Sequence, residues 1–137
     1  MARESKEDRA ERQARDEWQM IDVLRRAGNE VVPEFEFLNR HTGHYFRLDY
    51  LINSNVALEI QGFGFGHVAR KGWLRDISKA QQIAENGWLF CPVTRDHVAN
   101  GEALEALARC GVQVVAPCPH ASGATEAGNC AKCGAKQ

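Results

Sequence analysis

Two acidic side chains, Asp49 and Glu59, interrupt segments of the sequence that are otherwise rich in apolar residues. The segments around them, residues 46–50 and 56–62, alternate apolar and polar positions, which is typical of strands with one polar face. If residues 53–55 form a three-residue hairpin loop, Asp49 lies directly opposite Glu59. Like charges opposite each other destabilise a sheet, and a bound cation would convert this cost into binding.

A divalent metal ion is the cation that suits two neighbouring carboxylates. Mg²⁺ is commonly held by one or two carboxylates together with water and phosphate oxygens. Gln61 shares the face of Glu59 because strand side chains alternate, and its amide would orient a water molecule or a phosphate oxygen. The pattern favours a Mg²⁺ or Mn²⁺ site that hydrolyses phosphodiesters. The alternative is a solvated sheet face that carries unrelated charges.

The elements that position these residues follow from hydrophobic periodicity and turn residues. Helices are predicted over three segments: 5–27, 69–86 and 96–109. Strands are predicted over five segments: 33–38, 44–52, 56–61, 88–93 and 112–116. The strand at 88–93 is almost continuously apolar and is expected inside the sheet. This order predicts an α/β fold with an αβββαβ core, in which helices flank a mixed central sheet.

The predicted strands also assign side chains to faces. The inward set is Phe46, Leu48, Tyr50 and Ile52 from the second strand, and Val56, Leu58 and Ile60 from the third. The outward set is Arg47, Asp49, Ala57, Glu59 and Gln61.

The chain of 137 residues supports one domain over residues 1–117, followed by a tail over residues 118–137 that is rich in small residues and cysteine. A net charge of −1 gives no overall signal for a polyanionic partner. Residues 40–79 nevertheless contain six basic residues and three acids, which suits a phosphate backbone or an ordinary solvated surface. The charged N-terminus does not resemble a signal peptide, and no apolar run is long enough to cross a membrane, so we expect a soluble cytoplasmic protein.

The tail contains four soft metal ligands, which are Cys118, His120, Cys130 and Cys133. The pair at 130 and 133 has the Cys-x-x-Cys-Gly pattern of half a zinc knuckle, whose turn directs both thiolates at one ion. Zn²⁺ would also order a segment this poor in apolar residues. The alternative is a disordered tail with free thiols.

The ordered set of motifs resembles the PD-(D/E)xK nuclease superfamily, with its restriction-endonuclease-like fold. More narrowly, it resembles the small phage and bacterial endonucleases of the VRR-NUC and very-short-patch-repair type. The matching motifs are an acidic strand at 33–37, Arg-x-Asp at 47–49 and Ala-x-Glu-Ile-x-Gly at 57–62, followed by His67, Lys79 and Gly87-Trp88. The resemblance covers about residues 18–94.

This resemblance implies a metal-dependent endonuclease that hydrolyses DNA, with Asp49 and Glu59 as ligands of Mg²⁺ or Mn²⁺. Gln61 stands where the superfamily usually has lysine, and Lys79 on the next helix would supply the missing positive charge. Glu34 is preferred over Glu36 as an additional acid by its position in the motif, although periodicity cannot separate the two. Glu17 on the first helix is a further candidate, with a solvated helix charge as its alternative.

Five basic residues are expected to contact the phosphate backbone, namely Arg47, His67, Arg70, Lys71 and Arg75. The expected partner is duplex or branched DNA. A homodimer would suit an enzyme that cuts both strands, although no dimer face is predicted. The sequence is also compatible with two other classes: a catalytically silent nucleic-acid-binding module, for which Gln61 is the main argument, and a zinc-dependent scaffold in which the sheet is only structural.

Overall fold

The computed structural model describes residues 3–61 and 70–115. The elements along the chain are α1 (Lys6–Arg26), β1 (Val31–Leu38), β2 (Tyr45–Ile52), β3 (Val56–Gln61), α2 (Arg70–Glu85), β4 (Leu89–Thr94), α3 (Arg95–Asn100) and α4 (Glu102–Arg109). The predicted α/β class and the order helix–strand–strand–strand–helix–strand are confirmed. The cysteine-rich tail lies outside the described residues.

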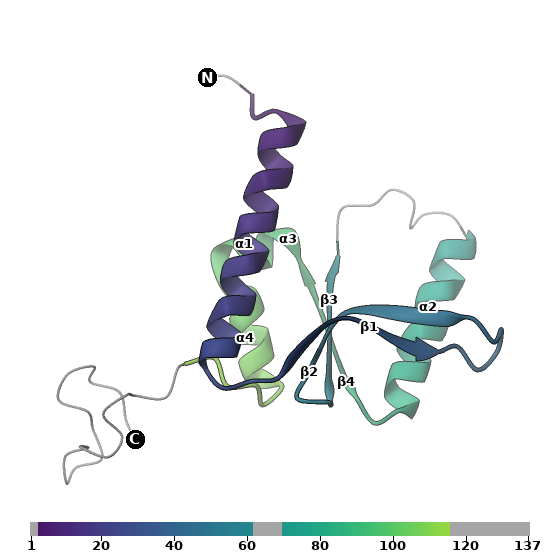
Figure 1. Ribbon diagram of the computed structural model, residues 1–137. Coiled ribbons are helices and arrows are strands. Elements are labelled where there is room, and N and C mark those ends of the chain that lie inside the picture. Colours follow the sequence, from purple (N-terminus) through teal and green to yellow (C-terminus); the bar gives the residue numbers. More distant parts are fainter. Residues whose placement is uncertain (1–2, 62–69, 116–137) are drawn as a thin grey trace, which may run out of the picture.

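The four strands form one mixed sheet in the order β1-β2-β3-β4. The first three strands are antiparallel, and β4 runs parallel to β3. Figure 1 shows α1, α3 and α4 on one face of the sheet and α2 on the other. The molecule is therefore a three-layer sandwich, and its sheet is covered on both faces.

Each face of the sheet carries its own hydrophobic core. The core beneath α1, α3 and α4 includes Met20, Ile21, Leu24, Ile52, Val56, Leu58, Cys91, Val93 and Leu107. The core beneath α2 consists of Phe37, Phe46, Leu48, Leu51, Ala57 and Ile83. Burial of these apolar side chains is the main source of stability, because each Val, Leu, Ile, Phe or Met contributes about 1.5–3 kcal/mol when fully removed from water.

In the hairpin formed by β1 and β2, the apolar side chains switch from one face of the sheet to the other about halfway along its length. Phe46 and Leu48 pack beneath α2, whereas Ile52 packs beneath α1 with Tyr50 beside it. The change occurs where Glu34 adopts a left-handed φ of 50° and the pairing of β1 with β2 skips one position. The prediction that the apolar residues of this strand share one face is therefore wrong, because a local backbone irregularity interrupts the alternation.

The predicted interior position of the fourth strand is also wrong. β4 is an edge strand, and Leu89 and Phe90 are 52% and 39% exposed. The expected fifth strand does not form over residues 112–115. This segment is held instead by the α4 end and the α1–β1 turn: Val112 N donates to Leu107 O, and Asn29 Nδ2 donates to Gln113 O.

The helix predicted over 96–109 is divided into α3 and α4 by Gly101, whose φ of 89° is readily adopted only by glycine. Thr94 caps α3: its hydroxyl accepts from His97 N, and His97 Nδ1 accepts from Thr94 N. In the part of the chain that the structure describes, no helix is both long and apolar enough to cross a membrane.

Candidate functional site

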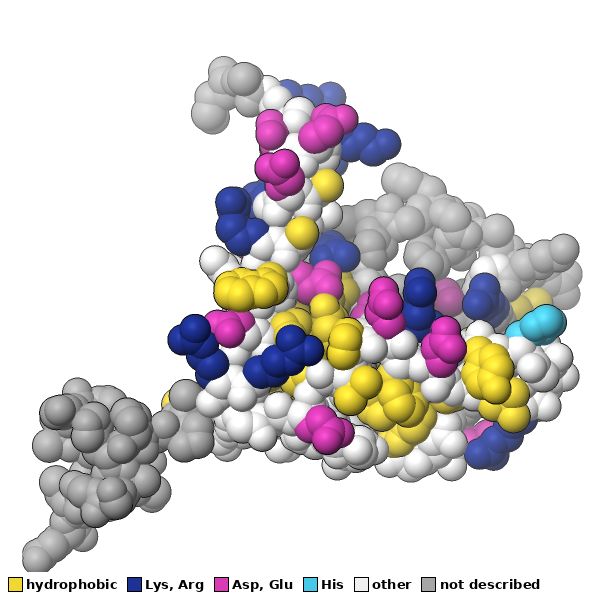
Figure 2. Space-filling model, in the orientation of Figure 1, with side chains coloured by type: hydrophobic (Ala, Val, Ile, Leu, Met, Phe, Trp, Pro, Cys, Tyr) yellow, Lys and Arg dark blue, Asp and Glu magenta, His cyan; other side chains and the backbone are white. Residues whose placement is uncertain are grey.

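The predicted acidic pair lies in a hollow between β2, β3 and α2. Two adjoining depressions share four lining residues, Asp49, Glu59, Asp76 and Lys79, and together we call them the acidic hollow. One depression extends past Gln61 and the other past Glu36, Arg47 and Arg75. In Figure 2, acidic and basic side chains lie close together on the upper surface between the α1 side and the right-hand end of the molecule.

Asp49 and Glu59 are brought together by the β2–β3 hairpin. Ile52 pairs with Val56, which leaves residues 53–55 as the loop, and the predicted three-residue hairpin is confirmed. The paired residues end at Tyr50 and Leu58, one position before Asp49 and Glu59, and both carboxylates line the acidic hollow. The Asp49 carboxylate accepts a hydrogen bond from Ile60 N at 2.7 Å, so it is fixed against β3 beside Glu59.

Glu59 is buried, with only 8% of its surface exposed. Burial raises the pKa of Glu59 above its ordinary value of 4.5. The neighbouring Asp49 carboxylate raises this pKa further, whereas the Lys79 ammonium opposes the rise. Glu59 lies on the face opposite Leu58, as predicted, but this face is not outward, because α2 covers it and Ala57 on the same face is fully buried.

Lys79 reaches the acidic pair from α2, as the sequence suggested. Its ammonium donates to Glu59 Oε1 in an ion pair, and it also donates to Arg47 O at 2.5 Å. The two side chains of the pair are only 19% and 11% exposed. A mostly buried ion pair of this kind is costly to break, because either partner alone would be a buried charge without compensation.

Gln61 occupies the last position of β3 and pairs with Thr94 of β4. Its side chain is exposed and lines the acidic hollow, on the same face as Glu59. It therefore points away from the core, in the position expected of a group that orients a water molecule or a phosphate.

Asp76 lines the acidic hollow from α2, although it was not among the predicted site residues. Its spacing of three residues from Lys79 places the two on neighbouring positions of one helix face. This spacing is the signal that was available once Lys79 had been selected as a site residue.

The two glutamates of β1 are separated by the irregular backbone at position 34. Glu36 lines the acidic hollow together with Asp49 and Glu59, whereas Glu34 is not among the residues that line it. The left-handed φ of Glu34 breaks the alternation that would have placed both carboxylates on one face. The geometry thus brings Glu36 to the site, rather than the preferred Glu34.

Two of the predicted phosphate-binding residues, Arg47 and Arg75, line the hollow from β2 and α2. Arg70 and Lys71 begin α2, but their side chains lie outside the described residues, as does His67. The zinc ligands predicted in the tail, Cys118, His120, Cys130 and Cys133, also lie outside them. Over residues 3–61 and 70–115, no group of three or more His, Cys, Asp or Glu side chains is placed to hold a metal ion.

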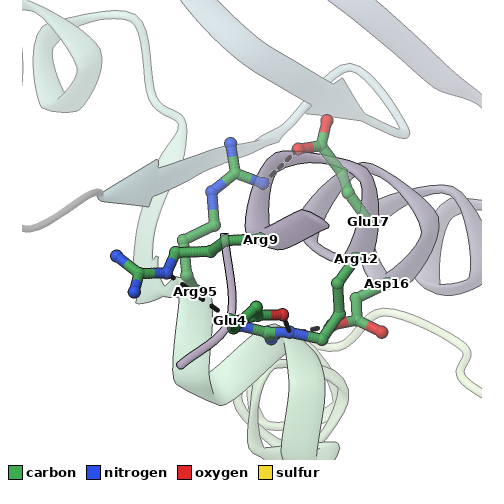
Figure 3. Close-up of polar contacts among 6 residues, drawn as sticks. All are labelled: Glu4, Arg9, Arg12, Asp16, Glu17 and Arg95. Atoms are coloured by element: carbon green, nitrogen blue, oxygen red, sulfur yellow. Dashed lines mark hydrogen bonds and ion pairs between the residues drawn. The ribbon is translucent and has the colours of Figure 1, made fainter. Parts of the chain in front are cut away.

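Glu17 does not join the acidic hollow. Its carboxylate accepts from the Tyr50 hydroxyl at 2.5 Å and from Arg95 Nη1 at 2.6 Å, in a groove beneath α1. Figure 3 shows Arg95 directed toward Glu17, near a second group of ion pairs among Glu4, Arg9, Arg12 and Asp16. Burial, followed by the hydrogen bond to Glu17, raises the pKa of Tyr50. These contacts give Glu17 a role in joining α1, β2 and α3.

Comparison of the chain with protein-family models, curated proteins and solved structures finds no match. The fold and the site define an α/β protein that holds a buried glutamate, a half-buried aspartate and a lysine between its sheet and one helix.

Proposed function

We propose that this protein is a metal-dependent endonuclease that hydrolyses phosphodiester bonds of duplex or branched DNA. The observation that carries this proposal is the convergence of Asp49 and Glu59 beneath α2, with Lys79 and Gln61 lining the same hollow. The resemblance of the motifs to the PD-(D/E)xK superfamily and to its restriction-endonuclease-like fold supports the same assignment.

The donor set of the hollow fits Mg²⁺ or Mn²⁺. Asp49 and Glu59 offer hard carboxylate oxygens, and with two protein ligands the remaining positions would be filled by water and phosphate oxygens, as is usual for Mg²⁺. When bound, the metal ion supplies polarisation of the phosphoryl oxygen and activation of the attacking water. The unfavourable proximity of the two carboxylates is offset by such an ion.

The other residues of the hollow have roles that follow from their charge and position. Arg47 and Arg75 hold the phosphates on either side of the scissile bond through contacts that weaken as salt increases. Gln61 orients the attacking water with its amide. Lys79 provides the positive charge that the superfamily usually places at position 61, and it stabilises the negative charge that develops on the phosphoryl group.

One observation favours a second function, a DNA-binding module without catalysis. Lys79 is already paired with Glu59, and the Asp49 carboxylate already accepts from Ile60 N. An ammonium held in this way neutralises Glu59 without any metal ion. In this alternative, glutamine at position 61 is explained by the absence of catalysis, because a protein that only binds DNA does not need a lysine there.

Cleavage of plasmid and branched DNA with Mg²⁺ or Mn²⁺ distinguishes the two functions. Removal of Asp49 or Glu59 by substitution with alanine is expected to lower the cleavage rate by at least about 100-fold, the scale seen when a group that stabilises developing charge is removed. Asp22→Ala is the control, because Asp22 lies on α1 in an exposed pair with Arg26. Undiminished cleavage by both alanine variants would refute the nuclease assignment, and DNA binding without cleavage by the wild type would favour the silent module.

We also propose that the tail binds structural Zn²⁺ through Cys118, His120, Cys130 and Cys133. The Cys-x-x-Cys-Gly pattern supports this site. Elemental analysis of the full chain should find about one zinc per protein, and a Cys130→Ser/Cys133→Ser variant should lose it. Equal zinc content in the two proteins would exclude the tail as the ligand source.

A further inference from the structure

We propose that a hollow at the tip of the β1–β2 hairpin binds an unpaired nucleotide of the DNA substrate, directly beside the acidic hollow. This inference depends on the proposed function and narrows its substrate class. It selects DNA in which an unpaired nucleotide adjoins the scissile phosphate, such as a gap, flap or junction, over continuous duplex.

The hairpin-tip hollow lies between the β1–β2 turn, the start of β2 and α2. It has a volume of about 580 Å³, within the range typical of small-ligand sites. It shares Tyr45, Phe46 and Arg75 with the acidic hollow, so the two are continuous. A nucleotide in the tip hollow can therefore be part of a DNA strand whose next phosphates lie beside Arg75 and the acidic pair.

Its lining combines exposed apolar surface with groups that can carry positive charge. Tyr45 from β2 is 63% exposed and Leu74 from α2 is 50% exposed, so the two elements that border the hollow each present an apolar side chain. His41, His44 and Arg75 complete the rim. In Figure 2, hydrophobic, basic and histidine side chains lie together at the right-hand end, where Figure 1 places the hairpin tip.

This composition suits a nucleotide better than a purely apolar ligand. Aromatic side chains bind unpaired bases by stacking on their faces, and basic side chains bind the attached phosphate. A base within a duplex cannot reach such a site without being unstacked and unpaired, which costs a few kcal/mol. A base that is already unpaired enters without this cost, and this difference is the source of the expected preference.

The hollow is pre-formed because a buried amide fixes the turn to α2. Gln82 is 1% exposed, and its Oε1 accepts from Arg40 N at 2.8 Å. Its Nε2 donates to Asn39 Oδ1 at 3.0 Å and to Ser78 Oγ at 3.2 Å. Asn39 Oδ1 also accepts from His41 N. Binding therefore orders little of the protein backbone, which favours affinity.

Fluorescence anisotropy of the full chain in EDTA tests this proposal without cleavage. Two labelled DNAs of identical sequence are compared: a continuous duplex and the same duplex with a gap of three nucleotides. The wild type is expected to bind the gapped DNA at least about 5-fold more tightly. Tyr45→Ala should weaken binding to gapped DNA by about 5- to 150-fold, the range for loss of one stacked base, so that the ratio of the two Kd values approaches one.

Three further variants make the result specific. Tyr45→Phe keeps the ring and should preserve the ratio, whereas Leu74→Ala should lower it. Trp18→Ala removes an aromatic side chain that is 65% exposed on α1, and it should leave the ratio at the wild-type value. Since Tyr45 is exposed, we expect its variants to fold, and thermal melting verifies this.

Equal affinity of the wild type for both DNAs would overturn the proposal, as would a Tyr45→Ala variant with an unchanged ratio. The nuclease assignment is tested separately by cleavage in Mg²⁺. Cleavage that depends on Asp49 but shows no preference for gapped DNA would overturn only the nucleotide site. A preference for gapped DNA without cleavage would support the site and overturn the nuclease assignment. Failure to bind either DNA in EDTA, together with no cleavage in Mg²⁺, would overturn both.

Discussion

Replacement of Lys79 by methionine tests whether the acidic hollow is as desolvated as its geometry indicates. The substitution preserves the length and most of the apolar stem of the side chain but removes the ammonium paired with Glu59. Glu59 would then be a buried acid beside Asp49 with no cation of its own. Because the two paired side chains are 19% and 11% exposed, the expected loss is close to that for a buried pair.

Breaking a fully buried ion pair costs about 3–5 kcal/mol, and the residual exposure of the Lys79 ammonium lowers the expected loss to about 2–4 kcal/mol. For a domain of roughly this length, the melting temperature should fall by about 8–16 °C, at about 4 °C per kcal/mol. The pKa of Glu59 should rise further, because the ammonium is the group that opposes its rise. Mg²⁺ should restore part of the lost stability, because a cation bound to Asp49 and Glu59 replaces the missing charge.

The assay is thermal and urea unfolding at pH 7.5, with EDTA or with 10 mM Mg²⁺. The control is Arg26→Ala, which breaks an exposed pair on α1 and should cost less than about 0.5 kcal/mol. A double-mutant cycle with Glu59→Gln isolates the coupling between the paired side chains. A loss below 0.5 kcal/mol for Lys79→Met would show that the pair is solvated, and absence of any Mg²⁺-dependent stabilisation in both wild type and variant would contradict a metal site at Glu59.

Three further outcomes are expected from the same geometry. Gln61→Lys should raise the Mg²⁺-dependent cleavage rate by about tenfold, equivalent to about 1.4 kcal/mol at the transition state, and an unchanged single-turnover rate would argue against a role for this position. Since the pKa of Glu59 is raised on folding, its contribution to the free energy of unfolding is complete below pH 4.5 and is lost as the pH rises through the folded pKa. The stability of Glu59→Gln relative to wild type should therefore increase as the pH rises above 4.5. Urea titrations in which the two proteins have parallel pH profiles would contradict this. Gln82→Leu should lower the free energy of unfolding by about 2–3 kcal/mol, because it leaves buried partners in the hairpin turn unsatisfied, and loss of less than 0.5 kcal/mol would show that the turn is not fixed by this amide.

The element order was predictable because each element carries a strong local signal. Alternation, helical periodicity and Gly87 define β1 to β3 and α2 within a few residues of their observed ends. The position of β4 was not predictable from its apolar run alone, because Cys91 and Val93 are buried beneath α1, α3 and α4 whether or not another strand follows. Pro92 was the available signal, since a proline within a strand is expected at a sheet edge.

The proximity of Asp49 and Glu59 was also predictable, because hairpin register depends on loop length and the loop has turn-forming residues. The burial of Glu59 was not, since it depends on how α2 packs across the sheet. The selection of Glu34 over Glu36 shows a similar limit. A single left-handed φ redirects the side chains of β1, and nothing in the alternating sequence indicates where that residue lies.

The edge of β4 bears on how the protein associates. In a parallel pair, alternate residues direct their backbone groups to the same neighbour, and Leu89 N donates to Asn55 O on the β3 side. The outward-facing positions are therefore 90, 92 and 94. Pro92 has no N–H, and Thr94 N donates to His97 Nδ1, so only Phe90 offers an outward donor. Strand addition at this edge is thereby disfavoured, and a homodimer would require another surface.

The irregularity shared by β1 and β2 is best explained by the acidic hollow. A left-handed φ at a residue other than glycine costs about 1–3 kcal/mol, and Glu34 has this conformation where the pairing with β2 skips Asp49. The Asp49 carboxylate, in turn, accepts the Ile60 N–H and lies beside a buried glutamate. Backbone strain and the proximity of like charges thus occur at one point, where packing alone would favour a regular sheet. A ligand that binds both carboxylates would offset these costs, because binding to the folded state stabilises it.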